Sequence, residues 1–222
     1  MTILSTDILQ FLRATGPEHD SIQQEMVSYA EKEGFPIIGP ESGGVLRLLA
    51  RLTNATRVFE FGSGYGYSAY WFLQGMDDGR IVLTEFDEDE LEMGREFFAR
   101  AELTAHVSFE HGDAMETIER YDGPFDIVLI DHQKHRYAEA FERVKPKLSP
   151  GGIVIADNIM SGPIDFDRLR GYMAGEWGLP DPATDKETEG IGRYLKTVRT
   201  DAAFETIVLP IGSGISISMC VN

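Results

Sequence analysis

The sequence predicts an α/β protein with a doubly wound, mainly parallel seven-stranded sheet and a C-terminal antiparallel hairpin. Five short apolar segments follow one another after residue 56: Arg57–Phe61, Ile81–Thr84, Val107–Phe109, Phe125–Ile130 and Ile153–Ala156. Helix-like segments such as 88–101 and 137–147 lie between most of them. Strands that alternate with helices are typical of a parallel sheet covered on both faces. The 222 residues, 42% of them hydrophobic, suffice for one core, and we expect one domain over residues 1–222.

Three amphipathic segments precede the first strand, at residues 3–13, 18–33 and 41–53, and predict N-terminal helices that pack on the core within residues 1–55. The segments "TGPEHD" and "EGFPIIGPESGG" separate them. At the other end, "FETIVLPIGSGISISMCV" contains two strand-like segments around a Gly-containing turn, which predicts the hairpin. Residues 161–190 are rich in Gly, Pro, Asp and Glu, and we expect them to form a mobile loop.

The net charge of −17, from 37 acidic and 20 basic residues, disfavours nucleic acid and anionic lipid as partners. It resembles the surface of a salt-adapted protein; the alternative is an ordinary acidic protein. No apolar run reaches 18 residues, and the N-terminus lacks the basic region of a secretory signal. The single cysteine, Cys220, cannot form an internal disulfide or a zinc cluster, which favours the cytoplasm.

All five predicted strands are followed by glycine or an acidic residue. In open α/β sheets, ligands bind beyond the carboxyl ends of the strands. The residues that follow the five strands are Gly62–Gly66, Glu85, Asp113, Asp131 with Lys134, and Asp157 with Asn158. We expect them to form the functional site.

The first of these strand ends is the glycine-rich turn in "RVFEFGSGYGYSAYW". Such a turn suits a nucleotide-like ligand, but its G-x-G-x-G spacing differs from the G-x-G-x-x-G of dinucleotide sites. A tight turn without a ligand is the alternative. Glu85 lies 23 residues after Gly62, where a carboxylate can accept hydrogen bonds from both hydroxyls of a ribose. Alternatively, it is one of several exposed acids in "EFDEDE".

Asp131, Asp157 and Asn158 follow two apolar strands and offer only oxygen ligands, which suit Mg²⁺ or Ca²⁺ better than zinc. Alternatively, Asp157 and Asn158 cap a helix or turn. Lys134 lies three residues after Asp131, and their combination favours the metal site. Of the neighbouring histidines, we expect His132 to form part of the wall or to lie directly behind the metal ligands.

The motifs "FEFGSGYGYS", "TEFDED", "GDA", "LIDHQKHRY" and "LSPGGIVIADN" together resemble the cation-dependent O-methyltransferases. This class I S-adenosylmethionine family includes the catechol and caffeoyl-CoA O-methyltransferases, and the resemblance covers about residues 35–220. It implies a Rossmann-like methyltransferase fold and a glycine turn that holds the methionine part of the cofactor. The implied cofactor-binding residues are Ile38, Glu60, Gly62, Ser68, Glu85, Asp113, Ala114 and Asp131.

The resemblance also implies the chemistry. Asp131, Asp157 and Asn158 would bind Mg²⁺ or another hard divalent cation, two vicinal oxygens of a catechol-like acceptor would chelate it, and Lys134 would act as general base. Relatives are often dimers, so a homodimer is possible. Two other functions are open: a nicotinamide-dependent oxidoreductase, against which the glycine spacing argues, and a non-catalytic S-adenosylmethionine-binding protein.

Three positions depart from the family pattern. Gln133 stands where an aromatic or small residue is more usual, Leu195 occupies the asparagine position of the "IRxFN" region, and Ser213 replaces a frequent aspartate. These changes leave the cofactor and metal residues in place and put the acceptor in question.

Overall fold

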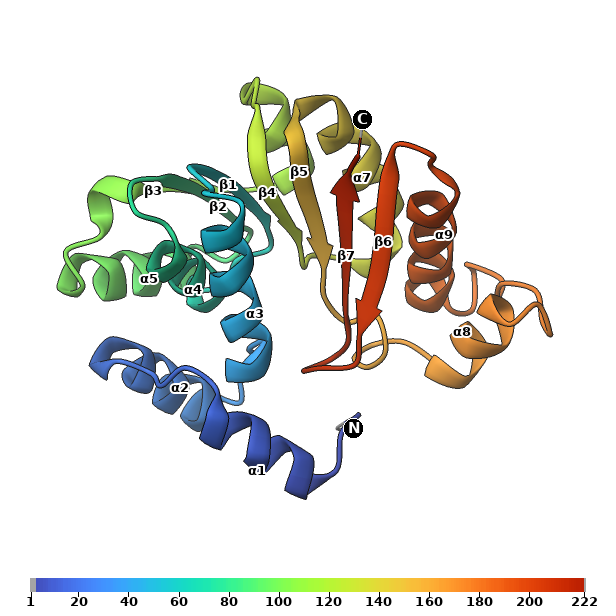
Figure 1. Ribbon diagram of the computed structural model, residues 1–222, viewed down its shortest axis with the longest axis horizontal. Coiled ribbons are helices and arrows are strands. Elements are labelled where there is room, and N and C mark those ends of the chain that lie inside the picture. Colours follow the sequence, from blue (N-terminus) through green and yellow to red (C-terminus); the bar gives the residue numbers. More distant parts are fainter. Residues whose placement is uncertain (1–2, 222) are drawn as a thin grey trace.

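A seven-stranded sheet forms the centre of the computed structural model, which describes residues 3–221 (Figure 1). The strand order is β3-β2-β1-β4-β5-β7-β6. β1 to β5 are parallel, whereas β7 is antiparallel to both β5 and β6. This arrangement confirms the predicted fold class and the C-terminal hairpin. The strands are β1 Arg57–Phe61, β2 Arg80–Glu85, β3 Val107–His111, β4 Phe125–Ile130, β5 Leu148–Ala156, β6 Phe204–Leu209 and β7 Ile215–Cys220.

Helices cover both faces of the sheet. Residues of α2 to α5 pack in one hydrophobic core and residues of α6 to α9 in the other. Strand β1 contributes side chains to both cores, because Val58 faces the first core while Phe59 and Phe61 face the second. The helices are α1 Thr6–Thr15, α2 Ser21–Glu33, α3 Gly39–Leu52, α4 Tyr67–Gly75, α5 Glu88–Arg100, α6 Ala114–Thr117, α7 Tyr137–Val144, α8 Phe166–Met173 and α9 Lys186–Thr200. Within residues 3–221, no helix is long and apolar enough to cross a membrane.

The register of the central strands aligns their carboxyl ends. Phe61 in β1 pairs with Thr84 in β2 and with Ile130 in β4, and Ile130 pairs in turn with Ala156 in β5. The residues that follow these strands therefore leave the sheet at one edge. This alignment places the glycine turn beside the two predicted metal-binding aspartates.

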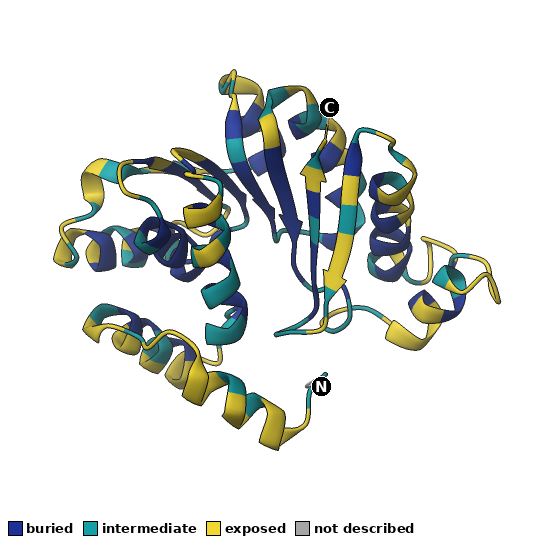
Figure 2. Ribbon diagram, viewed as in Figure 1, coloured by how far each residue is buried: buried dark blue, intermediate teal, exposed yellow. Residues whose placement is uncertain are grey.

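The N-terminal helices differ in how firmly they are attached. In α2, the carbonyl of Met26 accepts a hydrogen bond of 2.9 Å from the Tyr65 hydroxyl, and Asp20, which caps the helix, accepts one of 2.8 Å from Tyr70. In α1, which is described throughout, no residue is buried, and Ile8 and Phe11 are 48% and 65% exposed. Figure 2 shows α1 as a mostly exposed helix at the margin of the molecule.

The expectation that residues 161–190 form one loop was wrong, because α8 and the first turn of α9 lie within them. Asp165 caps α8 by accepting a hydrogen bond from the Arg168 N–H at 3.0 Å. Leu169 is buried in the second core, and the ring of Trp177 lies where a side chain on Gly171 would lie. A capping aspartate and a buried leucine therefore stabilise a helix despite the polar composition.

Candidate functional site

A cavity of about 560 Å³ opens at the edge where the carboxyl ends of β1, β2, β4 and β5 meet. Most of the predicted site residues line it: Ile38, Gly62, Ser68, Glu85, Asp131, Lys134, Asp157 and Asn158. The predicted residues Glu60, Asp113 and Ala114 are not part of this lining. A larger cavity, of about 1050 Å³, lies among the N-terminal helices, and Phe35 and Ile37 border both.

The glycine turn fits closely against the end of β4. Gly62, Gly64 and Gly66 all have positive φ, at 76°, 49° and 87°, which other residues rarely adopt. A side chain on Gly62 would place its Cβ 2.8 Å from the carbonyl oxygen of Asp131. The turn therefore presents backbone atoms to the cavity, without intervening side chains, beside the end of β4 and Asp131.

Glu60 is a buried acid beneath this turn. It is 1% exposed and its Oε1 accepts a hydrogen bond from the Ser68 hydroxyl, while its Oε2 has no partner within residues 3–221. Burial raises the pKa of Glu60 well above its ordinary value, although the bond from Ser68 acts in the opposite direction. Glu60 therefore lies behind the cavity wall and orients Ser68, which faces the cavity.

Backbone N–H groups fix the carboxylate of Glu85. Its Oε2 accepts from Gly64 at 2.9 Å, and its Oε1 accepts from Phe86 at 2.7 Å and from Asp87 at 3.2 Å. The carboxylate therefore joins the glycine turn to the end of β2. Each carboxylate oxygen has two acceptor sites, so Oε2, which accepts only from Gly64, can still receive one hydrogen bond from a ligand in the cavity.

The predicted metal-binding residues come together. Asp131 accepts a hydrogen bond of 2.8 Å from Lys134 Nζ, and burial raises the pKa of Asp131 against the opposing effect of Lys134. Asp157 is 3% exposed, and its Oδ1 has no hydrogen-bond partner in the described chain. Burial, and then the nearby charge of Asp131, raise the pKa of Asp157 to about 8. Asn158 donates from Nδ2 to the carbonyl of Ser161 at 3.2 Å, which leaves Oδ1 as its ligand atom.

This set fits a hard divalent cation. Among residues 3–221, no group of three or more His, Cys, Asp or Glu residues is placed to hold a metal, so a cation here would have two carboxylates and one amide oxygen as protein ligands. Mg²⁺ is commonly bound by one or two carboxylates, with water and substrate oxygens completing its shell. The unpaired buried oxygen of Asp157 is the feature that such a cation would satisfy.

Lys134 lies at the inner wall of the cavity, 7% exposed, on a turn held from both sides. On one side, Glu187 at the start of α9 accepts hydrogen bonds from the backbone N–H of His135 and pairs with its ring Nδ1, both at 3.0 Å. On the other side, Arg136 pairs with Asp113 at 2.9 Å. Glu187 also lines the cavity. Neither contact was predicted: Glu187 lies within the segment expected to be a loop, and Arg136 and Asp113 lie 23 positions apart in the sequence.

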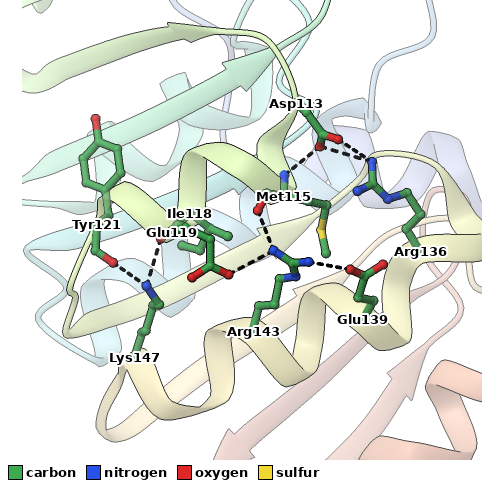
Figure 3. A network of polar contacts seen from close by, with 9 residues as sticks. All are labelled: Asp113, Met115, Ile118, Glu119, Tyr121, Arg136, Glu139, Arg143 and Lys147. Carbon is green, nitrogen blue, oxygen red and sulfur yellow. Dashed lines mark hydrogen bonds and ion pairs between the residues drawn. The ribbon is translucent and has the colours of Figure 1, made fainter.

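The Asp113 carboxylate pairs with Arg136 (Figure 3) and does not line the cavity. Its two oxygens accept from Arg136 Nη1 at 3.1 and 2.9 Å, and Oδ1 also accepts from the Met115 N–H at 2.8 Å. Burial acts to raise the pKa of Asp113, but these hydrogen bonds outweigh it, and the pKa lies below its ordinary value. The predicted adenine contact of Asp113 and Ala114 stays a prediction.

The same network continues along α7. Arg143 donates to the carbonyl of Met115 and pairs with Glu119, both at 2.9 Å, and it pairs with Glu139 at 2.7 Å (Figure 3). Lys147 donates to the carbonyls of Ile118 and Tyr121 at 2.9 and 2.8 Å. These contacts attach the segment after β3 to α7 and to the turn that follows it.

The ring of His132 forms part of the cavity wall, as predicted. It stacks on Tyr137 with a centroid distance of 5.6 Å and an interplanar angle of 10°, and it lies 5.3 Å from the ring of Phe61. Burial, followed by the charges of Arg136 and Lys134, lowers the pKa of His132 to about 3. The imidazole is therefore neutral at physiological pH.

Comparison with known proteins identifies the family. The family model described as O-methyltransferase matches residues 15–221, which is nearly the whole chain. The chain belongs to the O-methyltransferase family. A protein of Niastella koreensis named catechol O-methyltransferase is 33% identical over 202 residues, which cover 87% of this chain and 85% of that protein. Tricin synthase 2 of Oryza sativa is 25% identical over 215 residues, or 90% of this chain and 70% of the relative.

Solved structures of O-methyltransferases share the fold. The enzyme from Bacillus cereus, solved in complex with SAH, superposes with a TM-score of 0.81 at 23% identity and covers 97% of both chains. The O-methyltransferase TomG of Streptomyces achromogenes, solved with SAM, has a TM-score of 0.81 at 22% identity, over 97% of this chain and 96% of that one. These structures confirm the fold, and the family model and the Niastella koreensis relative confirm the suspected family.

Proposed function

We propose that this O-methyltransferase transfers the methyl group of S-adenosylmethionine to a hydroxyl of a catechol-like small molecule, with the help of Mg²⁺ or another hard divalent cation. The observation that carries the proposal is the buried, unpaired Oδ1 of Asp157, which lies in one cavity with Asp131 and Lys134. The catechol O-methyltransferase name of the Niastella koreensis relative supports the acceptor class, and the solved SAM and SAH complexes support the donor.

The glycine turn and Glu85 form the proposed donor site. Bare backbone at Gly62 and the hydroxyl of Ser68 suit the amino-acid end of the donor, with Ile38 as an apolar wall. Glu60 holds Ser68 in place from below. Glu85, fixed by three backbone N–H groups, would accept a hydrogen bond from a ribose hydroxyl at Oε2. At Asp113 and Ala114, only backbone groups remain as proposed contacts of the adenine edge, because Arg136 occupies the Asp113 carboxylate.

The proposed chemistry depends on how the chain arranges two acidic groups and one base. Asp131, Asp157 and Asn158 would hold the cation, and Asp131 can also face the amino group of the donor. When bound, the cation favours the ionised form of an acceptor hydroxyl. Lys134 Nζ, which lies 2.8 Å from Asp131, would take the proton of that hydroxyl. The buried walls exclude water and align the acceptor oxygen with the methyl group, and alignment of this kind supplies much of the rate enhancement of an enzyme.

Methyl transfer to a panel of catechols, with and without EDTA, tests this function. We expect transfer of the labelled methyl group to one hydroxyl of the catechol and loss of activity in EDTA that Mg²⁺ restores. Phenols with one hydroxyl serve as the control, since they cannot chelate. Turnover that is insensitive to EDTA would contradict the cation role, and turnover of single phenols at equal rates would contradict the catechol class.

The two alternatives make different predictions. A nicotinamide-dependent oxidoreductase would be stabilised by NADH in a thermal shift measurement, whereas we expect stabilisation by S-adenosylmethionine alone. A non-catalytic binding protein would show the same thermal shift with no methyl transfer to any acceptor. The cavity position of Lys134 beside Asp131 favours catalysis over binding alone.

We further propose a homodimer that covers the apolar side of α1 and α3. Phe11 in α1 is 65% exposed, and Leu48 and Leu52 in α3 are 54% and 68% exposed. Leu48 and Leu52 lie one turn apart on α3, and contiguous exposed apolar side chains mark interaction surfaces. Light scattering should give twice the chain mass for the native protein and the single mass for Phe11→Glu. A native monomer at micromolar concentration would overturn this proposal.

The cytoplasm stays the proposed location, because one cysteine cannot form an internal disulfide.

A further inference from the structure

Asn158, the proposed amide ligand of the cation, has an uncommon backbone conformation. Its φ is +58°, in the left-handed region that residues other than glycine seldom adopt, although asparagine tolerates it. Its side-chain Nδ2 donates to the carbonyl of Ser161, so the amide is oriented by the loop that leaves β5. The position of the ligand oxygen therefore depends on the path of this loop.

The loop after β5 is held by the turn between β6 and β7, residues 210–214, which lies beside it in Figure 1. The backbone N–H groups of residues 159–161 donate to two carbonyls of this turn. Gly214 accepts one hydrogen bond of 2.9 Å, and Ser213 accepts two, of 2.9 and 3.0 Å. The turn therefore fixes the backbone immediately after Asn158.

Two glycines of this turn pack against different neighbours. Gly214 has a φ of +81°, and a side chain there would place its Cβ 2.6 Å from Cγ of Met160 and 2.9 Å from the backbone nitrogen of that residue. Gly212 has a φ of +55°, and its Cβ would overlap the Ser42 hydroxyl and lie 2.9 Å from the carbonyl oxygen of Ile38. The turn is therefore packed between the loop after β5 on one side and the start of α3 on the other.

We propose that the turn between β6 and β7 positions Asn158 for cation binding, with Gly214 as the residue that contacts the loop. The inference rests on the proposed function, because it assumes a cation at Asp131, Asp157 and Asn158. Groups that hold a metal ligand in place typically contribute about 10- to 100-fold to metal affinity. Here these groups are backbone carbonyls, so the ligand is ordered when the chain folds and loses little freedom when the cation binds.

Mn²⁺ binding, followed by electron paramagnetic resonance in protein saturated with S-adenosylhomocysteine, tests the inference without turnover. We expect Gly214→Ala to weaken Mn²⁺ binding about tenfold, because the new side chain displaces the loop, while the affinity for S-adenosylhomocysteine stays nearly native. Gly212→Ala is the matched control: it also places a side chain at a positive φ in this turn, but it presses on α3 and should keep the native Mn²⁺ affinity. Equal losses in the two variants would overturn the inference.

A second background separates positioning from general strain. Asn158→Gly permits the positive φ and removes the amide oxygen, so Gly214→Ala should cause no further loss of Mn²⁺ affinity in that background. An equal loss with and without Asn158 would overturn the inference, and so would native Mn²⁺ affinity in Gly214→Ala alone.

Hydrogen exchange of the native protein decides if Gly214→Ala does not fold. We expect Mg²⁺ to slow exchange at the N–H groups of residues 159–161 and at the Gly214 N–H, which donates to the Ile211 carbonyl at 2.8 Å within the turn. Slowing that is absent, or confined to residues 159–161, would overturn the inference. A native protein without any Mn²⁺ site that Asp157→Ala removes would instead refute the proposed cation.

Discussion

Asp113 and Asp157 each follow a parallel strand directly or within two residues, yet their carboxylates differ in how many hydrogen bonds they accept. Asp113 accepts two hydrogen bonds from Arg136 and one from a backbone N–H. Asp157 is more deeply buried, and its Oδ1 has no partner within residues 3–221. A buried polar atom without a partner costs free energy unless a ligand supplies one. The difference therefore separates an acid that stabilises the fold from one held ready for a ligand.

Removal of the unpaired acid should have the largest effect on activity and little effect on the fold. We expect Asp157→Ala to lower kcat/KM by about 1,000-fold, because a catalytic cation contributes several kcal/mol of transition-state stabilisation. In EDTA, the free energy of unfolding should stay the same or rise, since the substitution removes a buried acid that the chain leaves unpaired. Methyl-transfer kinetics and urea unfolding measure the two quantities. Unchanged sensitivity to EDTA in the residual activity would contradict the assignment of Asp157 as a ligand.

Lys134 lines the same cavity as Asp157, and its loss should have the next largest effect. We expect Lys134→Ala to lower kcat by about 100-fold, the lower end of the usual contribution of a general base, while S-adenosylhomocysteine binding measured by calorimetry stays nearly native. The control is Lys147→Ala, since Lys147 donates to two backbone carbonyls away from the cavity. That variant should lose about 1 kcal/mol of stability and keep its kcat. Lost donor affinity in Lys134→Ala would refute the role of Lys134 as base.

The paired acid should show the opposite pattern. We expect Asp113→Ala to lower the free energy of unfolding by about 1–2 kcal/mol, the lower part of the range for hydrogen bonds to charged groups, because the pair with Arg136 is partly exposed. The effect on kcat should be far smaller than that of Asp157→Ala. Urea unfolding and methyl-transfer rates test both statements. A stability change below that of Asp157→Ala would break the comparison.

The pH dependence of stability sharpens the same comparison. The pKa of Asp113 is lower in the folded protein than in the unfolded chain, where it is about 3.9. The contribution of Asp113 to the free energy of unfolding is therefore fully present above the unfolded-state pKa and disappears as the pH falls through the folded-state pKa. The stability difference between the native protein and Asp113→Asn should therefore be constant above about pH 5 and shrink below about pH 4. Urea unfolding at several pH values measures it. A difference that grows toward low pH would contradict the direction of the shift.

The sequence predicted the strand-end residues because they depend on local patterns. Apolar segments marked where β1 to β5 end, and parallel strands bring those ends to one edge, so Gly62, Asp131 and Asp157 met as expected. The pairing of Asp113 with Arg136 joins residues 23 positions apart and has no local signal. The role of Glu187 was missed for a related reason, since it depends on how α9 packs against the Lys134 turn.

Close packing explains that contact in physical terms. A side chain on Gly190 would place its Cβ 2.3 Å from the Cα of His135, so α9 touches the turn after Lys134 directly. A glycine in a polar segment reads as a loop signal in sequence, although here it permits two elements to meet. The acidic composition of residues 161–190 likewise concealed the buried Leu169 of α8. Long-range packing, and not local propensity, decides such positions.

Glu187 resembles Asp113 in being paired, here with His135, and resembles Asp157 in lining the cavity. Its substitution should have a smaller effect on kcat than that of Asp157 or Lys134. We expect Glu187→Gln to lower kcat by about three- to tenfold, since the loss of one charge-assisted hydrogen bond loosens the turn that carries Lys134. Calorimetric affinity for S-adenosylhomocysteine should stay native. Glu189→Gln is the control on the same helix, because Glu189 pairs with Arg193 and should leave kcat unchanged. Equal losses in the two variants would show that α9 acts through stability alone, whereas a loss confined to Glu187→Gln would place this carboxylate as a positioning residue for Lys134.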